Sequence, residues 1–331
     1  MCVGNTLNLN APTYSGGTYS WTSTSTTPFT STLEDPSIPN VTTNNSGTYS
    51  LVVTVAGCPS SPGTVNVAVN AIPSAPTAGS NSPVCVGFPI NLTASTVSGA
   101  SSYNWTHATS GYTSSTQNPT IASAALSDGG TYYVTATVSG CTSTASGSVS
   151  VTVNPIPTAP SVSSNSPVCE GSTLNLTAST VGTSTYAWTG PASFSSSSQN
   201  PSRSSVTLPM AGNYTVTPTD KGCVGPSATV NVTINAKPLA PAPNSNTPIC
   251  QGQTILLTQP TVSGANYAWT GPNGFASNVQ NPTIPNATSA EGGTYNIIIT
   301  VNGCSSSSGS TSVAINQPAT VDAGPCEHDK L

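Results

Sequence analysis

The segment DGGTYYVTATVSGC occupies residues 128–141 and decides the fold. Its middle, Thr131–Val138, is built from Tyr, Val, Thr and Ala, most of which favour strands. Apolar and polar side chains alternate along this stretch, as expected for a half-buried strand. The Ser139–Gly140 dipeptide that follows is a turn signal. The segment therefore predicts a long strand that runs into a tight turn and ends at Cys141.

The same pattern occurs four times along the 331 residues. A Gly-x-Tyr triplet precedes a second cysteine by nine residues, and a tryptophan and a first cysteine lie upstream at constant spacing. Self-similarity at a fixed period indicates repeat architecture. The four sets are Cys2, Trp21, Tyr49 and Cys58; Cys85, Trp105, Tyr132 and Cys141; Cys169, Trp188, Tyr214 and Cys223; and Cys250, Trp269, Tyr295 and Cys304.

Proline-rich segments separate the repeats, for example NAIPSAPTAGSNSP at residues 70–83. Proline fixes φ and favours extended backbone, so these joints are predicted to be short and semi-rigid. The expected domains are repeat 1 at 1–71, repeat 2 at 72–155, repeat 3 at 156–236, repeat 4 at 237–317 and a tail at 318–331.

Each repeat contains several short strand patterns. In repeat 2 these include INLTAST at 90–96, SYNWTH at 102–107, QNPTIAS at 117–123 and GSVSVTVN at 147–154. About seven short strands with regular turn signals are typical of a β-sandwich. No useful length of helical periodicity is present. The tryptophan and the tyrosine of each repeat are the predicted centre of its core.

The composition excludes several classes of partner. Only 4% of residues are charged, and the basic ones are Arg203, Lys221, Lys237 and Lys330. Binding nucleic acid requires clustered cations, so we exclude it, and the same shortage of cations argues against binding anionic lipid heads. No apolar run approaches the length of about 20 residues that spans a bilayer, so membrane insertion is not expected.

The Asp128-x-Gly130-x-Tyr132 segment resembles the tyrosine corner of immunoglobulin domains, and Trp105 sits where that family has its core tryptophan. The combination of Cys-x-Gly, Trp, Gly-x-Tyr and Gly-Cys is similar to Ig-like and PKD-like repeats in surface adhesins of gliding bacteria with type IX secretion. This resemblance implies an all-β chain of four tandem immunoglobulin-like sandwiches in a rod, located extracellularly or at the cell surface.

One departure concerns the cysteines. Antibody domains place a cysteine two residues after the corner tyrosine, but here those positions hold Leu51, Val134, Val216 and Ile297. Spacing alone favours pairing within repeats, as Cys2–Cys58, Cys85–Cys141, Cys169–Cys223 and Cys250–Cys304. In the resembled fold, however, the two cysteines of one repeat lie at opposite ends, about 20 Å apart. Pairing between neighbours, as Cys2–Cys141, Cys85–Cys223 and Cys169–Cys304, is the alternative, and free buried thiols are a third, which the repeated positions of the cysteines disfavour. Cys326 is the odd ninth cysteine.

Residues for chemistry are scarce. The two histidines, His107 and His328, lack a second ligand at zinc spacing. The pair Glu34 and Asp35 has no further carboxylates nearby, as a calcium site would need. We therefore predict no catalytic residue, no cofactor and no metal, although calcium at the joints stays open. Tyr112, Phe194 and Phe275 are candidates for glycan contact, and core packing is the competing interpretation.

The two ends of the chain differ from the other joints. Repeat 1 starts at Cys2 without the strand that precedes Cys85, and the tail segment PATVDAGPC resembles such a strand. Donation of this tail to repeat 1 of another copy would give an open fibre. A chain cut at repeat edges is the simpler interpretation, which we favour.

Repetition without a chemical site indicates structure rather than catalysis. We expect an extracellular stalk or fibre subunit, not an enzyme, whose partners are other copies of itself or neighbouring repeats of a longer chain. The alternative is an adhesin that binds surface glycans or another cell through its loops.

Overall fold

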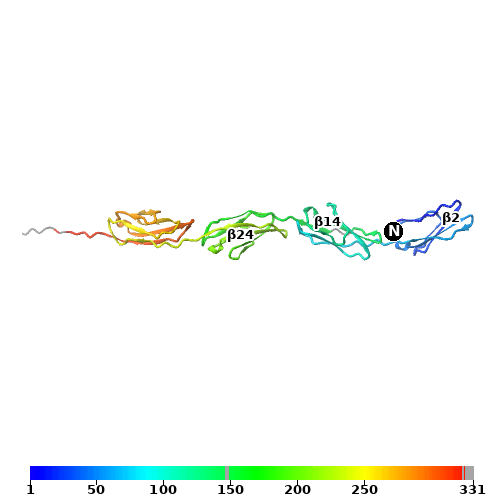
Figure 1. Ribbon diagram of the computed structural model, residues 1–331, viewed down its shortest axis with the longest axis horizontal. Helices are drawn as coiled ribbons and strands as arrows, with labels where there is room; N and C mark the ends of the chain where they lie inside the picture. The colour runs from blue at the N-terminus through cyan, green and yellow to red at the C-terminus, as the bar shows by residue number, and fades with distance from the viewer. Residues whose placement is uncertain (146–148, 323, 325–331) are drawn as a thin grey trace, which may run out of the picture. The chain divides into compact units, whose positions relative to one another are not determined.

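The computed structural model describes residues 1–145, 149–322 and 324, and this part of the chain is all-β. Four sandwiches follow one another, and each occupies its own stretch of the colour scale in Figure 1. The residues form two compact units: one contains Met1–Ile156 with Lys221–Cys223, and the other contains Pro157–Asp220 and continues from Val224.

Repeat 2 shows the plan of each sandwich. One sheet has the order β13-β10-β8, and the other has the order β12-β11-β14-β15, with β16 also paired to β14. A short parallel pair, β9 with β17, closes one end. The bounds are β8 Ala78–Ser80, β9 Val84–Cys85, β10 Ile90–Ala94, β11 Ala100–His107, β12 Thr113–Ser114, β13 Thr120–Ile121, β14 Gly130–Val138, β15 Cys141–Thr142, β16 Val149–Val151 and β17 Val153–Asn154.

Repeats 3 and 4 repeat this plan. Repeat 3 has β18 Val162–Ser164, β19 Val168–Cys169, β20 Leu174–Ala178, β21 Thr185–Gly190, β22 Phe194–Ser196, β23 Ser202–Arg203, β24 Gly212–Asp220, β25 Cys223–Val224, β26 Ala228–Val232 and β27 Ile234–Asn235. Repeat 4 has β28 Asn244–Ser245, β29 Ile249–Cys250, β30 Ile255–Thr258, β31 Asn266–Thr270, β32 Ala276–Ser277, β33 Thr283–Ile284, β34 Gly293–Val301, β35 Cys304–Ser305, β36 Gly309–Val313 and β37 Ile315–Asn316.

Repeat 1 differs in its smaller sheet. Its strand β1 pairs only with β4, whereas β10, β20 and β30 each pair with a strand on both sides. The described strands of this repeat are β1 Leu7–Asn8, β2 Gly17–Ser23, β3 Thr30–Ser31, β4 Ser37–Ile38, β5 Gly47–Val55, β6 Cys58–Pro59 and β7 Gly63–Val67. The predicted tail, 318–331, lies largely outside the described residues, and the described part of it forms no strand.

Each repeat has a core of its own around its tryptophan and tyrosine. Trp105 and Tyr132 are fully buried, and Trp105 lies opposite Val134 in the β11–β14 register. Val134 is the position at which antibody domains carry a cysteine, so here an apolar contact replaces that disulfide. The side chains at the equivalent positions Trp21, Trp188, Trp269, Tyr49, Tyr214 and Tyr295 are buried as well.

A short 3-10 turn precedes the long strand of each repeat and fixes the tyrosine corner. In repeat 2 this turn is η2, Leu126–Asp128. The Tyr132 hydroxyl donates to the backbone carbonyl oxygen of Asp128 over 2.9 Å, and the Asp128 carboxylate accepts a bond from the Ala125 N–H. Equivalent turns are η1 Thr43–Asn45, η3 Leu208–Met210 and η5 Ser289–Glu291, while η4 Pro272–Gly274 lies beside Trp269 in sequence.

The recurring Gln-Asn-Pro segment ties the two sheets together. In repeat 2 the Trp105 indole N–H donates to the carbonyl oxygen of Gln117, and the Gln117 side-chain amide donates to the carbonyl oxygen of Ala94. Asn118 accepts a bond from the Ala94 N–H. These contacts place the indole against the end of β10. The segment follows the tryptophans of repeats 2, 3 and 4, and in repeat 1 Glu34-Asp35-Pro36 takes its place, where the Trp21 indole N–H donates to the Glu34 carbonyl oxygen.

Candidate functional site

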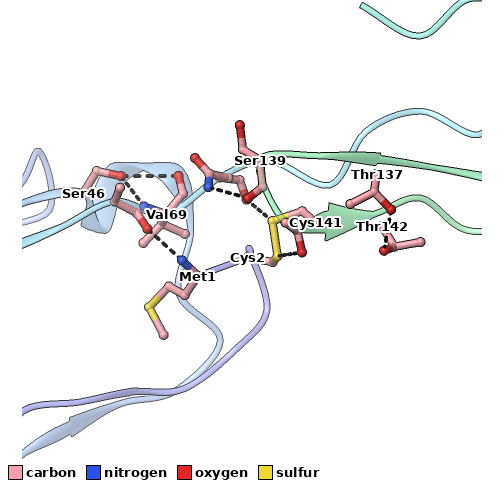
Figure 2. The surroundings of a disulfide bond; sticks show 11 residues. Met1, Cys2, Ser46, Val69, Thr137, Ser139, Cys141 and Thr142 are labelled. Carbon is pink, nitrogen blue, oxygen red and sulfur yellow. Dashed lines mark hydrogen bonds between the residues drawn. A yellow bond between two sulfur atoms is a disulfide. The ribbon is translucent and has the colours of Figure 1, made fainter. Parts of the chain in front are cut away.

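The joint between repeats 1 and 2 is covalent. Figure 2 shows Cys2 and Cys141 joined by a disulfide, with an S–S distance of 2.01 Å and a Cα–Cα distance of 5.6 Å. Beside it, the Asn70 side-chain amide donates to the carbonyl oxygen of Ser139 over 3.1 Å. The cysteine and the asparagine of repeat 1 thus both hold the same turn of repeat 2.

A tight turn and a bridge position Cys2. The Asn5 N–H donates to the Cys2 carbonyl oxygen, and Gly4 has a φ of 87°, which a type II turn requires and which suits glycine. Cys2 also forms an isolated parallel bridge with Asn70, three residues beyond the end of β7. Cys85, Cys169 and Cys250 pair in the same parallel way with Asn154, Asn235 and Asn316.

A second tight turn positions Cys141. Val138 lies opposite Cys141 in the β14–β15 register, so only Ser139 and Gly140 connect the strands. Both have positive φ, 49° and 81°, as a two-residue type I′ hairpin turn requires. The pairs Ala56–Gly57, Lys221–Gly222 and Asn302–Gly303 share this conformation. The Gly-Cys dipeptide of each repeat therefore places a cysteine directly after a hairpin turn.

The joint occurs three times in the described residues. Cys85 bonds to Cys223 and Cys169 bonds to Cys304, with Cα–Cα distances of 5.7 and 5.5 Å. The hydrogen bond recurs too: the Asn154 side chain donates to the Lys221 carbonyl oxygen over 3.3 Å, and that of Asn235 donates to the Asn302 carbonyl oxygen over 3.0 Å. The hairpin cysteines of these joints, Cys141, Cys223 and Cys304, are at most 1% exposed.

Of the two disulfide patterns that the sequence leaves open, the structure contains the one between neighbouring repeats. Pairing within repeats is wrong. In repeat 2, the bridge that holds Cys85 follows β16, which pairs with the Gly130 end of β14, whereas Cys141 follows the hairpin turn at the Val138 end of β14. A disulfide requires Cα atoms within about 7 Å, so strand direction forbids the internal pair.

Three cysteines stand outside these disulfides. Cys58 and Cys250 are both exposed, and each has a free thiol in the described part of the chain. Cys58 occupies the hairpin position of repeat 1, and Cys250 occupies the bridge position of repeat 4. Cys326 lies outside the described residues.

The four asparagines of the bridge are not among the residues predicted from the sequence. A usable signal existed, because Asn70, Asn154 and Asn235 each precede the next bridge cysteine by 15 residues and Asn316 ends the fourth repeat in the same way. An asparagine at a strand end is usually explained as a turn residue. Its role becomes visible only when the next repeat is in place.

His107 is held by local contacts. Its ring is buried against Tyr132, with the centroids 4.4 Å apart, and its Nδ1 accepts a bond from the Ser110 N–H over 2.8 Å. The Asp128 carboxylate binds the Ala125 N–H instead. His107 and Asp128 thus serve the backbone of their own loops, and His328 lies outside the described residues.

The aromatic residues considered for glycan contact pack on the corner tyrosines. Tyr112 meets Tyr132 edge to face, and Phe194 and Phe275 meet Tyr214 and Tyr295 in the same way, with centroids 5.3 to 5.7 Å apart. Edge-to-face packing is a favoured arrangement of aromatic rings. These three side chains therefore extend the cores of their repeats.

Burial affects two corner tyrosines. It raises the pKa of Tyr132 to about 12, with a further contribution from the Asp128 charge. Burial raises the pKa of Tyr295 in the same direction, helped by the Glu291 charge. Hydrogen bonds from the side chain and backbone of Thr288 lower the pKa of the exposed Glu291 carboxyl. All three effects follow from the tyrosine corner itself.

Over residues 1–145, 149–322 and 324, no three His, Cys, Asp or Glu side chains gather closely enough to hold a metal ion. The same residues contain no helix with the length and apolarity needed to cross a bilayer. The carboxylates of Glu34 and Asp35 accept hydrogen bonds from Thr13 and from the Ala11 N–H.

A family model described as "Ig-like domain CHU_C associated" matches residues 73–155. A search of curated proteins gives no match. Among solved structures, the eight N-terminal Ig domains of the Down syndrome cell adhesion molecule are 16% identical, with a TM-score of 0.24; the alignment covers 98% of this chain and 55% of that one. This chain therefore spans about half the length of that structure.

Two further structures have similarly low scores. The Ig domains 1–4 of Sidekick-1 are 13% identical with a TM-score of 0.27, and the alignment covers 95% of both chains. Three N-terminal domains of the highly immunogenic outer capsid protein of bacteriophage RB49 are 15% identical with a TM-score of 0.32. That alignment covers 74% of this chain and 99% of the phage chain.

Proposed function

We propose that this chain is a segment of an extracellular stalk whose length is fixed by disulfides between consecutive Ig-like repeats. The observation that carries the proposal is the pairing of Cys2 with Cys141, Cys85 with Cys223 and Cys169 with Cys304. A disulfide within one domain stabilises only that domain against unfolding. A disulfide between domains gives each joint a second covalent connection besides the peptide chain.

These disulfides shorten the covalent path along the molecule. A path from Cys2 crosses to Cys141, follows the backbone to Cys169 and crosses to Cys304. It contains about 30 residues and extends to about 100 Å when fully stretched, whereas the backbone route of about 300 residues would reach about 1,000 Å. Unfolding of the sandwiches under tension therefore cannot lengthen the stalk beyond this short path.

Disulfides of this kind form and persist in oxidising compartments, which supports a location of the stalk outside the cytosol. The packing of Tyr112, Phe194 and Phe275 on core tyrosines favours a stalk over an adhesin that binds glycans through these residues. The rings are part of the core rather than an open platform. The described residues support a structural role in preference to catalysis.

Single-molecule stretching tests the proposal. The chain is held by handles at both ends and pulled before and after reduction with dithiothreitol. We expect reduction to add about 900 Å to the final extension, because some 270 residues are released from the closed loops. An oxidised chain that lengthens as far as the reduced chain would refute the stalk function.

Donation of the C-terminal strand is a second element of the proposed function. It is supported by β1, which pairs on one side only, while β10, β20 and β30 pair on both. A strand added at this edge would complete the smaller sheet of repeat 1. Deletion of residues 318–331 tests it: fibres that assemble equally well without the tail would exclude this role.

A further inference from the structure

The two free thiols of the described residues belong to opposite halves of the joint. Cys58 follows the Ala56–Gly57 hairpin turn, as Cys141 follows Ser139–Gly140. Cys250 lies in a parallel bridge with Asn316, as Cys2 does with Asn70. Within the described residues, repeat 1 therefore carries the hairpin half of a joint, with Cys58 unpaired, and repeat 4 carries the bridge half, with Cys250 unpaired.

Both thiols, and the side chains around them, are more exposed to solvent than their equivalents in the three formed joints. Cys58 and Cys250 are exposed, whereas Cys141, Cys223 and Cys304 are buried and Cys2, Cys85 and Cys169 are partly buried. Asn316 is exposed, while its equivalents Asn70, Asn154 and Asn235 are partly or fully buried and donate to a hairpin carbonyl. Within the described residues, the Asn316 side chain has no such acceptor.

An apolar surface adjoins Cys58. Tyr14 and Val55 are 49% and 37% exposed, and together with Val53 and Cys58 they line a shallow hollow. The equivalent side chains near the formed joints, Val97 and Val138 in repeat 2 and Val262 and Val301 in repeat 4, are only partly exposed. The open end of repeat 1 thus exposes side chains that are more covered where another repeat adjoins.

We propose that Cys250 of one copy of this chain forms a disulfide with Cys58 of a second copy, in a joint of the same construction as the three internal ones. In each of the three formed joints the partner of a bridge half is a hairpin half of the same chain, and we infer the same kind of partner for each unpaired half. A contact between two different surfaces does not close a dimer, so it joins further copies into a filament or, where the rotation between copies closes, into a ring. This inference rests on the proposed stalk function and extends it to assembly.

The reaction is a thiol–disulfide exchange with a low-molecular-weight disulfide as oxidant. The Cys250 thiolate attacks the small disulfide, forms a mixed disulfide and releases one small thiol. The Cys58 thiolate of the second copy then attacks the Cys250 sulfur and displaces the second small thiol. Two cysteine thiols are oxidised, and one small disulfide is reduced to two thiols.

The test uses the full chain in a C326S background with its internal disulfides intact, incubated with oxidised glutathione and separated on a non-reducing gel. We expect the chain with both thiols to form a ladder of multimers and the C58S and C250S variants to stay monomeric. Their equimolar mixture is expected to give a dimer and nothing larger, because C250S supplies only a hairpin half and C58S only a bridge half.

Peptide mapping of the dimer identifies the bond. A Cys58–Cys250 crosslink supports the proposal. A ladder that persists in either single variant, a mixture that stays monomeric, or a dimer linked as Cys58–Cys58 or Cys250–Cys250 overturns it. Stretching of the monomeric variants separates this outcome from the stalk function, since their internal disulfides limit extension whether or not copies join.

A second variant tests the joint beyond the bare thiols. N316A removes the donor that its equivalents use in the formed joints, so we expect dimer formation to slow by about 2- to 10-fold. N278A replaces an exposed asparagine elsewhere in repeat 4 and should leave the rate unchanged. Equal rates for the two variants would show collision of exposed thiols rather than a built joint, and would overturn the proposal.

Discussion

The side-chain amide of Asn70 donates a hydrogen bond to the carbonyl oxygen of Ser139 over 3.1 Å, two residues before the disulfide-bonded Cys141. The donor belongs to repeat 1 and the acceptor to the hairpin turn of repeat 2. The same pair of positions is bonded in the two following joints. The hydrogen bond and the disulfide together fix the hairpin tip at two points.

We predict that N70A loosens the first joint. A typical hydrogen bond contributes about 0.5–1.5 kcal/mol, so reduction of the Cys2–Cys141 disulfide by dithiothreitol should become about 2- to 10-fold faster. The measurement is the rate of alkylation of Cys2 and Cys141 after timed exposure to the reductant. N10A, which changes an exposed asparagine of the same repeat, is the control and should keep the original rate.

We predict that C2S destabilises the chain and C58S does not. The first variant opens a loop of 139 residues, for which chain entropy predicts a loss of about 2–5 kcal/mol. The second changes an exposed, unpaired thiol, so its effect should stay within about 0.5 kcal/mol. Urea unfolding followed by tryptophan fluorescence measures both. Equal midpoints for the two variants would contradict the assignment of Cys2 to the joint.

We predict that alkaline pH opens the corner of repeat 2. The pKa of Tyr132 is raised to about 12 in the folded chain, against about 10 in an unfolded one. Its contribution to stability is therefore complete below pH 10 and is lost as the pH rises toward 12. Stability measured by urea unfolding should fall across this window. In Y132F the part of the fall that belongs to this phenol should vanish, and a fall of unchanged size would show that other groups cause it.

We predict a weaker effect of acid on repeat 4. Hydrogen bonds from Thr288 lower the pKa of Glu291, so the stabilisation is present above the usual carboxyl range and fades as the pH falls through the lowered value. Thermal unfolding of E291Q should therefore depend less on pH in this range than that of the original chain. Repeat 1 contains the control, because Asn45 accepts the equivalent bond from the Thr42 N–H without titrating.

The sequence predicts the fold well because its four tryptophans and its recurring corner tyrosines mark buried positions. Trp105 and Tyr132 recur at constant spacing, and packing around an indole and a phenol leaves little freedom for alternatives. The Gly-Cys signal also predicts the hairpin turns, since positive φ at Gly140 restricts the residue there. Local chemistry and the final structure agree at these positions.

The spacing of the cysteines alone does not determine which of them pair. Cys141 is as regularly placed with respect to Cys85 as to Cys2, and only strand direction distinguishes them. Asn70 was missed for a related reason, because its acceptor belongs to the next repeat. Where a contact crosses from one repeat to another, the periodic pattern contains no record of which copies meet.

The three disulfide-closed loops overlap along the chain, from Cys2 to Cys141, from Cys85 to Cys223 and from Cys169 to Cys304. Any single proteolytic nick between Cys2 and Cys304 therefore falls inside at least one loop, and both fragments stay attached to each other. A protease that cleaves an exposed linker would sever the backbone without releasing a piece. The molecule thus tolerates one break anywhere in this span, a form of damage resistance that disulfides confined to single domains would not provide.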